Sequence, residues 1–158
     1  MTSLWLADAQ ATASLGAALA ATRPSPAVVH LHGDLGAGKS TLARALLRAL
    51  GVQGAIRSPT YTLVERYPLA EGGEAWHLDL YRIADAGELE FLGLDGAEPT
   101  LWLVEWPERG AGALPVADLR VELALDGEGR RVRLVPGTEA GRIWVQATTS
   151  RHGVAADS

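Results

Sequence analysis

One glycine-rich stretch constrains this chain more than any other feature, because it requires a strand, a tight loop and a helix in that order. The stretch is Gly33-Asp34-Leu35-Gly36-Ala37-Gly38-Lys39-Ser40, which matches the phosphate-binding pattern G-x-x-x-x-G-K-[ST] at every fixed position. Residues 27–32 before it predict a short buried strand, and residues 39–50 after it predict a helix that ends at Gly51. Pattern and context together favour a true phosphate-binding loop over a chance glycine turn.

The basic residues of the chain support the same interpretation. Lys39 is the single lysine, and the other thirteen basic side chains are arginines. A compact ammonium on a flexible stem can follow the β- and γ-phosphates of a nucleotide, whereas a planar guanidinium has the wrong shape for that position. The loop glycines let backbone N–H groups turn toward an anion, and the following helix adds its positive N-terminal end. Ser40 offers a hydroxyl group to Mg²⁺.

The predicted helix after the loop is amphipathic. Arg44 and Arg48 lie on one face of it. The opposite face carries apolar residues at helical spacing and is expected to be buried, namely Leu42, Ala45, Leu46, Ala49 and Leu50.

Length and composition suit one compact domain. The chain has 158 residues, of which 47% are hydrophobic. We expect a single domain over residues 1–147 and a frayed tail over residues 148–158. The absence of cysteine excludes disulfides and thiolate metal sites, and it is compatible with a reducing cytoplasm, where we expect the protein to act.

Charge and hydropathy exclude several classes of partner. The net charge of −5 argues against a dedicated nucleic-acid binder, so we expect no direct DNA binding. Arginines 130, 131 and 133 could form a local basic patch, but the solvated face of a strand is the simpler interpretation. No apolar run has the length needed to span a membrane, and the first basic residue is Arg23, so the N-terminus lacks the charged start of a signal peptide.

The rest of the chain predicts an α/β fold with added antiparallel hairpins. The expected elements are a helix at 8–21, paired strands at 61–67 and 75–81, a short helix between Asp85 and Gly93, a strand at 100–104, a hairpin of 121–125 with 132–135, and a last strand at 143–146. Asp85 and Glu88 have the spacing of a capping box. In the strand at 75–81, alternation places Trp76, Leu78 and Leu80 on one face and His77, Asp79 and Tyr81 on the other.

Two carboxylates are candidates for the metal and for catalysis. Glu105 follows the apolar strand Leu101-Trp102-Leu103-Val104, so its side chain should emerge at the carboxyl end, where ligands of open α/β sheets bind. A metal role is favoured over a plain surface glutamate. Asp79 could bind Mg²⁺ through water or orient the attacking water, and an ion pair with Arg82 is an equally good alternative.

Two further residues are weaker candidates. His77 is more often a structural histidine than a catalytic one at such a position. Ser58-Pro59-Thr60 predicts an ordered turn before a strand, and Thr60 could reach a γ-phosphate as a switch residue does.

The nucleotide is expected to be ATP. The chain has no asparagine, so the N-K-x-D guanine reader of GTPases cannot form. Asp126 and Gly129 match a D-x-x-G switch only by letters, because they lie in a predicted hairpin turn. Three functions remain open: an ATPase that resets a larger complex, a small-molecule or nucleoside kinase, and a nucleotide-switched binding module without turnover.

The ordered motifs resemble those of the TsaE (YjeE) family, bacterial ATPases of tRNA threonylcarbamoyladenosine synthesis. The resemblance covers about residues 8–146 and rests on Gly33–Thr41, Ser58–Glu65, His77–Arg82, Glu88–Gly93 and Val104–Pro107. It implies a P-loop NTPase-like three-layer fold with a mixed, mainly parallel central sheet. It also implies ATP and Mg²⁺ binding with weak hydrolysis by the protein alone.

The resemblance further implies partners and residue roles. The expected partner is the TsaB–TsaD heterodimer, which modifies adenosine 37 of tRNAs reading ANN codons, so tRNA contact would be indirect. Ser40 and Glu105 are the implied Mg²⁺ ligands, with Trp106 beside the metal carboxylate, and Thr60 and Asp79 form the implied switch-like region. The implied nucleotide contacts are Gly33, Asp34, Leu35, Gly36, Ala37, Gly38, Lys39, Ser40 and Thr41, with Thr12 and Arg130 as outer contacts. Ser40 departs from the threonine usual in the family but keeps the hydroxyl group.

Overall fold

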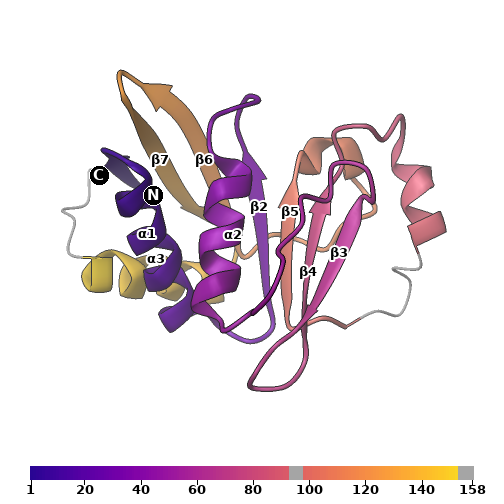
Figure 1. The fold of residues 1–158 in the computed structure, drawn as a ribbon, viewed down its shortest axis with the longest axis horizontal. Helices are drawn as coiled ribbons and strands as arrows, with labels where there is room; N and C mark the ends of the chain where they lie inside the picture. The colour runs from indigo at the N-terminus through magenta and orange to yellow at the C-terminus, as the bar shows by residue number, and fades with distance from the viewer. Residues whose placement is uncertain (93–97, 153–158) are drawn as a thin grey trace.

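The fold is a single mixed sheet with α-helices packed on one face (Figure 1). The computed structural model describes residues 1–92 and 98–152. The strands are β1 (Thr2–Leu6), β2 (Ala27–His32), β3 (Val64–Pro68), β4 (Glu74–Asp79), β5 (Leu101–Glu105), β6 (Leu119–Asp126) and β7 (Gly129–Pro136). The α-helices are α1 (Ala9–Thr22), α2 (Lys39–Ala49) and α3 (Glu139–His152), and the 3₁₀ helices are η1 (Ala86–Leu92) and η2 (Pro107–Gly110).

The sheet order, β1-β7-β6-β2-β5-β4-β3, places the parallel strands in the centre. Strand β2 pairs in parallel with β5 and β6, and β5 pairs in parallel with β4. The edges are antiparallel: β3 pairs with β4 on one side, and on the other side β7 pairs with both β6 and β1. The predicted α/β class with a mixed sheet is confirmed, and the carboxyl ends of β2, β4 and β5 meet at one edge.

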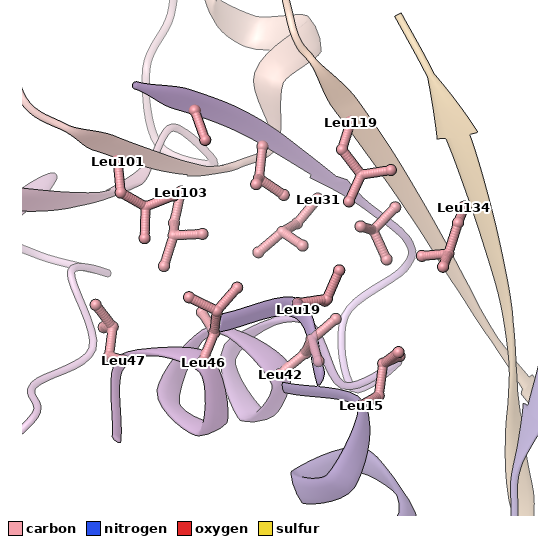
Figure 2. Packing of buried hydrophobic residues seen from close by; sticks show 14 of the residues in the cluster. Leu15, Leu19, Leu31, Leu42, Leu46, Leu47, Leu101, Leu103, Leu119 and Leu134 are labelled. Atoms are coloured by element: carbon pink, nitrogen blue, oxygen red, sulfur yellow. The ribbon is translucent and has the colours of Figure 1, made fainter. Parts of the chain in front are cut away.

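The main core lies between the sheet and the three α-helices. Figure 2 shows leucines of α1 and α2 facing leucines of β2, β5, β6 and β7 across this layer. Helix α2 contributes Leu42, Ala43, Leu46 and Leu47, each no more than 1% exposed. The predicted stripe is therefore partly wrong: Leu42 and Leu46 are buried, but Ala49 is exposed and Ala43 and Leu47 take its place.

The opposite face of the sheet has its own apolar cluster under the 3₁₀ helices. It contains Trp76, Leu78, Leu80, Ile83, Leu89, Trp102 and Val104, and the rings of Trp76 and Trp102 lie 5.5 Å apart. The predicted alternation in β4 is confirmed, because its even-numbered residues enter this cluster while Ala75 joins the main core. β4 is thus buried on both faces, which holds its carboxyl end in place.

The C-terminal prediction is wrong. Residues 143–146 form no strand but belong to α3, which also includes residues 148–152 of the expected tail. Gly141, Trp144, Val145 and Thr148 recur at i, i+3, i+4 and i+7, and all four are buried. The indole N–H of Trp144 donates to the Leu19 carbonyl oxygen at 3.1 Å, which ties α3 to α1. The β-prone side chains at 143–145 outweighed this helical spacing in the prediction.

The bounds of several other elements differ from the predicted ones, but the architecture is unchanged. Strand β1 was not predicted, and β3 begins at Val64 because residues 61–63 form a turn. The predicted short helix is the 3₁₀ helix η1, in which the Asp85 and Glu88 carboxylates accept backbone N–H groups of Gly87 and Ala84. Its expected end, Gly93, lies outside the described residues. Within residues 1–92 and 98–152, no helix combines the length and apolarity required to cross a membrane.

Candidate functional site

The glycine loop bridges the end of β2 and the start of α2, as predicted. Gly33 has φ 149°, and a Cβ atom there would lie 2.5 Å from the Leu123 carbonyl oxygen, so only glycine fits. Gly38 is the N-cap of α2 with φ 111°, a left-handed conformation that directs the loop into the helix. The loop borders a cavity of about 270 Å³. Its lining residues are Leu35, Gly36, Gly38, Lys39, Ser40, Thr41, Thr60, Asp79, Glu105, Trp106 and Arg130.

Lys39 is held inside the site rather than extended into solvent. Its side chain is 5% exposed, and its ammonium donates to the carbonyl oxygens of Gly33 and Asp34, the latter at 3.0 Å. The Nζ atom also lies 4.3 Å from the centre of the Trp106 ring. Burial lowers the pKa of Lys39 below its ordinary value, and the carboxylates of Glu105 and Asp79 oppose that shift. A cation so placed suits a ligand with several negative charges.

Ser40 and Glu105 meet across the cavity floor. The Ser40 hydroxyl donates to the Glu105 carboxylate, with 3.0 Å from Oγ to each carboxylate oxygen. Glu105 is 3% exposed, and its Oε2 atom also lies 2.6 Å from Nε2 of His77. The two predicted metal ligands, which are 65 residues apart in the sequence, are therefore brought together.

Asp79 stands beside Glu105, because the two residues are register partners in the β4–β5 pair. Its carboxylate accepts the backbone N–H of Tyr81 at 3.0 Å. Burial raises the pKa of Asp79 above its ordinary value, and the nearby Glu105 charge adds to the rise. The alternative ion pair with Arg82 is absent from the described residues: the Arg82 guanidinium instead lies 4.6 Å from the centre of the Tyr61 ring.

Trp106 lies at the site, next to Glu105. Its backbone is left-handed with φ 56°, a conformation that is unusual for a bulky residue and strained. Its ring lies 4.9 Å from that of Tyr81, and the Arg109 guanidinium lies 5.7 Å from the centre of the Tyr81 ring. Sequence reasoning placed Trp106 beside the carboxylate but missed this stack, which links Lys39 to the surface. The only sequence signal for it was an aromatic residue soon after each carboxylate, Trp106 one residue after Glu105 and Tyr81 two residues after Asp79.

Thr60 reaches the cavity from the loop that precedes β3. Its hydroxyl lies 2.7 Å from that of Ser58, as expected for an ordered turn. The loop ends at Leu63, a second residue with left-handed backbone, φ 69°. The Leu63 carbonyl oxygen accepts the Asp79 N–H at 3.0 Å, so this loop is tied directly to the second carboxylate.

Thr12 and Arg130 border a neighbouring cavity of about 250 Å³ on the other side of Gly38 and Thr41. Arg130 lines both cavities, and its Nε atom would lie 3.5 Å from a Cβ atom at Gly38. Arg131 and Arg133 instead pair with Asp126 and Glu122, each at 3.1 Å. Of the three basic residues on β7, Arg130 alone lines the site cavity.

Comparisons with known proteins show the family of the chain. The family model "Threonylcarbamoyl adenosine biosynthesis protein TsaE" matches residues 6–133. A TsaE protein of Haemophilus influenzae is 46% identical over 122 residues, covering 76% of this chain and 77% of its own length. One of Nostoc is 39% identical over 138 residues, with 83% of each chain covered.

A solved structure shows the same fold. The crystal structure of YdiB from Bacillus subtilis superimposes with a TM-score of 0.76 and 25% identity, covering 96% of this chain and 95% of that one. The chain therefore belongs to the TsaE family of threonylcarbamoyladenosine biosynthesis proteins.

Proposed function

We propose that this protein is a P-loop ATPase that binds ATP with Mg²⁺, hydrolyses it slowly alone, and acts with the TsaB–TsaD heterodimer. Its role would be the N6-threonylcarbamoyladenosine modification at position 37 of tRNAs reading ANN codons. The single observation that carries the proposal is the convergence of the glycine loop, Ser40 and Glu105 on one cavity. Family membership supports the pathway, and the cavity supports the chemistry.

The donors at the site fit Mg²⁺. Among the described residues, no group of three histidine, cysteine, aspartate or glutamate side chains is placed to hold a metal ion by itself. Mg²⁺ does not need one, because it keeps several waters and binds through one or two protein oxygens plus substrate phosphates. The Ser40 hydroxyl and the Glu105 carboxylate are such oxygens. When bound, Mg²⁺ would neutralise charge on the β- and γ-phosphates.

Residues of the chain itself would bind the phosphates, orient the attacking water and contact the rest of the nucleotide. Backbone N–H groups of the loop and the start of α2 bind phosphate oxygens, and Lys39 exchanges its carbonyl partners for the β- and γ-phosphates. Asp79 orients the attacking water, whose oxygen bonds to the γ-phosphorus as the bond to the β-phosphate oxygen breaks. Thr12 and Arg130 contact the nucleotide from the second cavity, and Thr60 contacts the γ-phosphate.

The exposed side of the site supports the proposed dependence on a partner. Tyr61 is 80% exposed and directly follows the cavity residue Thr60, and Tyr81 is 37% exposed and donates its backbone N–H to the Asp79 carboxylate. The stack of Trp106, Tyr81 and Arg109 connects Lys39 with that surface. A partner that covers Tyr61 and Tyr81 would hold Thr60 and Asp79 in one arrangement and so raise the rate of hydrolysis.

The test is steady-state phosphate release by the protein alone, with the TsaB–TsaD heterodimer, and with heterodimer plus unmodified tRNA. We expect a slow rate alone, a faster rate with the heterodimer, and tRNA modification that requires this protein and ATP. Glu105→Ala is the control for background hydrolysis. A fast rate that the heterodimer leaves unchanged would overturn the proposal, and transfer of phosphate to a nucleoside would indicate the kinase instead.

A further inference from the structure

His77 is a buried polar residue to which the proposed function assigns no role. It is 2% exposed on β4, on the sheet face that carries Asp79, and its register partner on β5 is Leu103. Nε2 contacts the Glu105 carboxylate at 2.6 Å, while Nδ1 is buried without a hydrogen-bond partner. A buried nitrogen without a partner destabilises the fold, and a leucine would fill the same space without that cost.

The register of β4 and β5 brings the His77 imidazole within hydrogen-bond distance of the Glu105 carboxylate. Glu105 lies diagonally across the β4–β5 pair from His77, one step nearer the carboxyl end of the strands. Among the described residues, the Glu105 carboxylate has hydrogen-bond contacts with the Ser40 hydroxyl and with His77 Nε2. Ser40 lies in the first turn of α2 and would itself turn to the metal, whereas His77 is 2% exposed on β4, between β3 and β5.

We propose that His77 is a positioning residue that donates from Nε2 to Glu105 Oε2 and so fixes the orientation of the carboxylate that receives Mg²⁺. This inference rests on the proposed function. With Oε2 held by His77, Oε1 stays available to the metal beside the Ser40 hydroxyl, which lies 3.0 Å from both carboxylate oxygens. Without the imidazole, the Glu105 side chain is free to turn away from the neighbouring Asp79 carboxylate, whose charge repels it. Hydrogen-bond partners of metal ligands of this kind affect metal affinity by about 10–100-fold.

Three substitutions separate a hydrogen bond from simple packing. His77→Gln can place an amide nitrogen near the position of Nε2, His77→Asn has a nitrogen only near the position of Nδ1, and His77→Leu has none. The readout is nucleotide affinity, measured by calorimetric titration of ADP at increasing Mg²⁺ and again in EDTA. Melting temperature is recorded for each variant.

We expect the leucine and asparagine variants to need about 10–100-fold more Mg²⁺ for the same gain in ADP affinity, with His77→Gln close to the unsubstituted protein. In EDTA, all variants should bind ADP equally. If His77→Leu does not fold, the glutamine and asparagine variants still give the comparison. The inference is overturned if His77→Leu keeps the normal Mg²⁺ dependence, if glutamine is as impaired as asparagine, or if affinity in EDTA falls as well.

The titrations give one result if the role of His77 is wrong and another if the proposed function is wrong. Glu105→Ala is titrated in parallel as the reference. If the unsubstituted protein binds no ADP, or Mg²⁺ has no effect on it, the proposed function fails. If Mg²⁺ strengthens binding and Glu105→Ala removes that gain while His77→Leu does not, only the role of His77 is wrong.

Discussion

The site has two halves that are built in different ways. The loop half, residues 33–41, is continuous in the sequence and offers backbone N–H groups and one lysine. The carboxylate half consists of Glu105, Asp79 and His77, which come from two strands and meet only through the register of β4 and β5. The loop half therefore depends on local backbone conformation, whereas the carboxylate half depends on packing of the whole sheet.

This difference leads to different expected functions. The loop half suits phosphate binding with or without a metal, since N–H groups and an ammonium attract anions directly. The carboxylate half repels a nucleotide unless a cation lies between them, so under the proposed function it would act through Mg²⁺ and through water. Substitutions in the two halves should consequently separate binding from hydrolysis.

The largest effect is expected from Lys39→Ala. The substitution removes the only ammonium of the loop half, and two charge-assisted hydrogen bonds at about 1.5–3 kcal/mol each correspond to a loss of about 10²–10⁴-fold in ATP affinity. Calorimetric titration in Mg²⁺ and in EDTA checks this, with Arg44→Ala on the exposed face of α2 as the matched control. ATP affinity near that of the unsubstituted protein would refute the assignment of the phosphate-binding loop.

Asp79→Asn should reduce hydrolysis stimulated by the heterodimer about 10²–10³-fold and leave ATP affinity nearly unchanged, because the residue acts on water. Asparagine keeps the oxygen that accepts the Tyr81 N–H, so the fold is retained. Stimulated rates and calorimetric affinities, measured side by side, test the expectation. An equal fall in both quantities would place Asp79 among the binding residues.

The same substitution should stabilise the protein in the absence of nucleotide. Because burial raises the pKa of Asp79, the folded protein binds that proton more tightly than the unfolded chain does. Stability therefore falls as pH rises from the ordinary pKa of 3.8 through the raised folded value, and the loss is complete above it. Asp79→Asn removes this loss, so its advantage in melting temperature should be largest at neutral pH and shrink toward acid. An advantage independent of pH would contradict the argument.

A smaller effect is expected from Trp106, which lies between the two halves. Mg-nucleotide binding should change tryptophan fluorescence, since the ammonium of Lys39 leaves the Trp106 ring when it turns to phosphate. Trp106→Phe should remove most of that change, and Trp5→Phe, at a 48% exposed position on β1, should not. If Trp106→Phe retains the full change, another tryptophan is the reporter.

The smallest effect is the preference for ATP over GTP, for which we expect about a tenfold difference in affinity. The chain has no asparagine to build a guanine reader, but backbone groups can also contact a base, which limits the difference. A competition titration measures it. Equal affinities would show that the base contributes nothing to selection.

The loop half could be predicted almost completely from the sequence, because its residues are consecutive and each has a fixed chemical role. β2 has the predicted bounds, α2 ends at Ala49, one residue earlier than predicted, and Lys39 and Ser40 line the cavity beside the loop. The position of Glu105 at the cavity could also be predicted, since an apolar strand ending in a carboxylate is a local pattern. The contact of His77 with Glu105 could not be predicted, because it depends on which strands pair and in which register.

The prediction for the C-terminal region was wrong for a related reason. Ile143, Trp144 and Val145 favour a strand locally, but the close packing of Gly141 against the Asp118 carbonyl oxygen and the bond from Trp144 to Leu19 make a helix there. Thr138 caps that helix by accepting the Gly141 N–H at 3.0 Å. Tertiary contacts outweigh propensity in this segment, as they do at the carboxylate half of the site.

The most direct test of the two-half account compares Lys39→Ala and Glu105→Ala by calorimetric titration of ATP in EDTA and in Mg²⁺. The account predicts that Lys39→Ala binds weakly in both conditions. Glu105→Ala should bind like the unsubstituted protein in EDTA and lack only the gain in affinity that Mg²⁺ provides. Weak binding of Glu105→Ala in EDTA, or a full Mg²⁺ gain in that variant, would contradict the separation of the two halves.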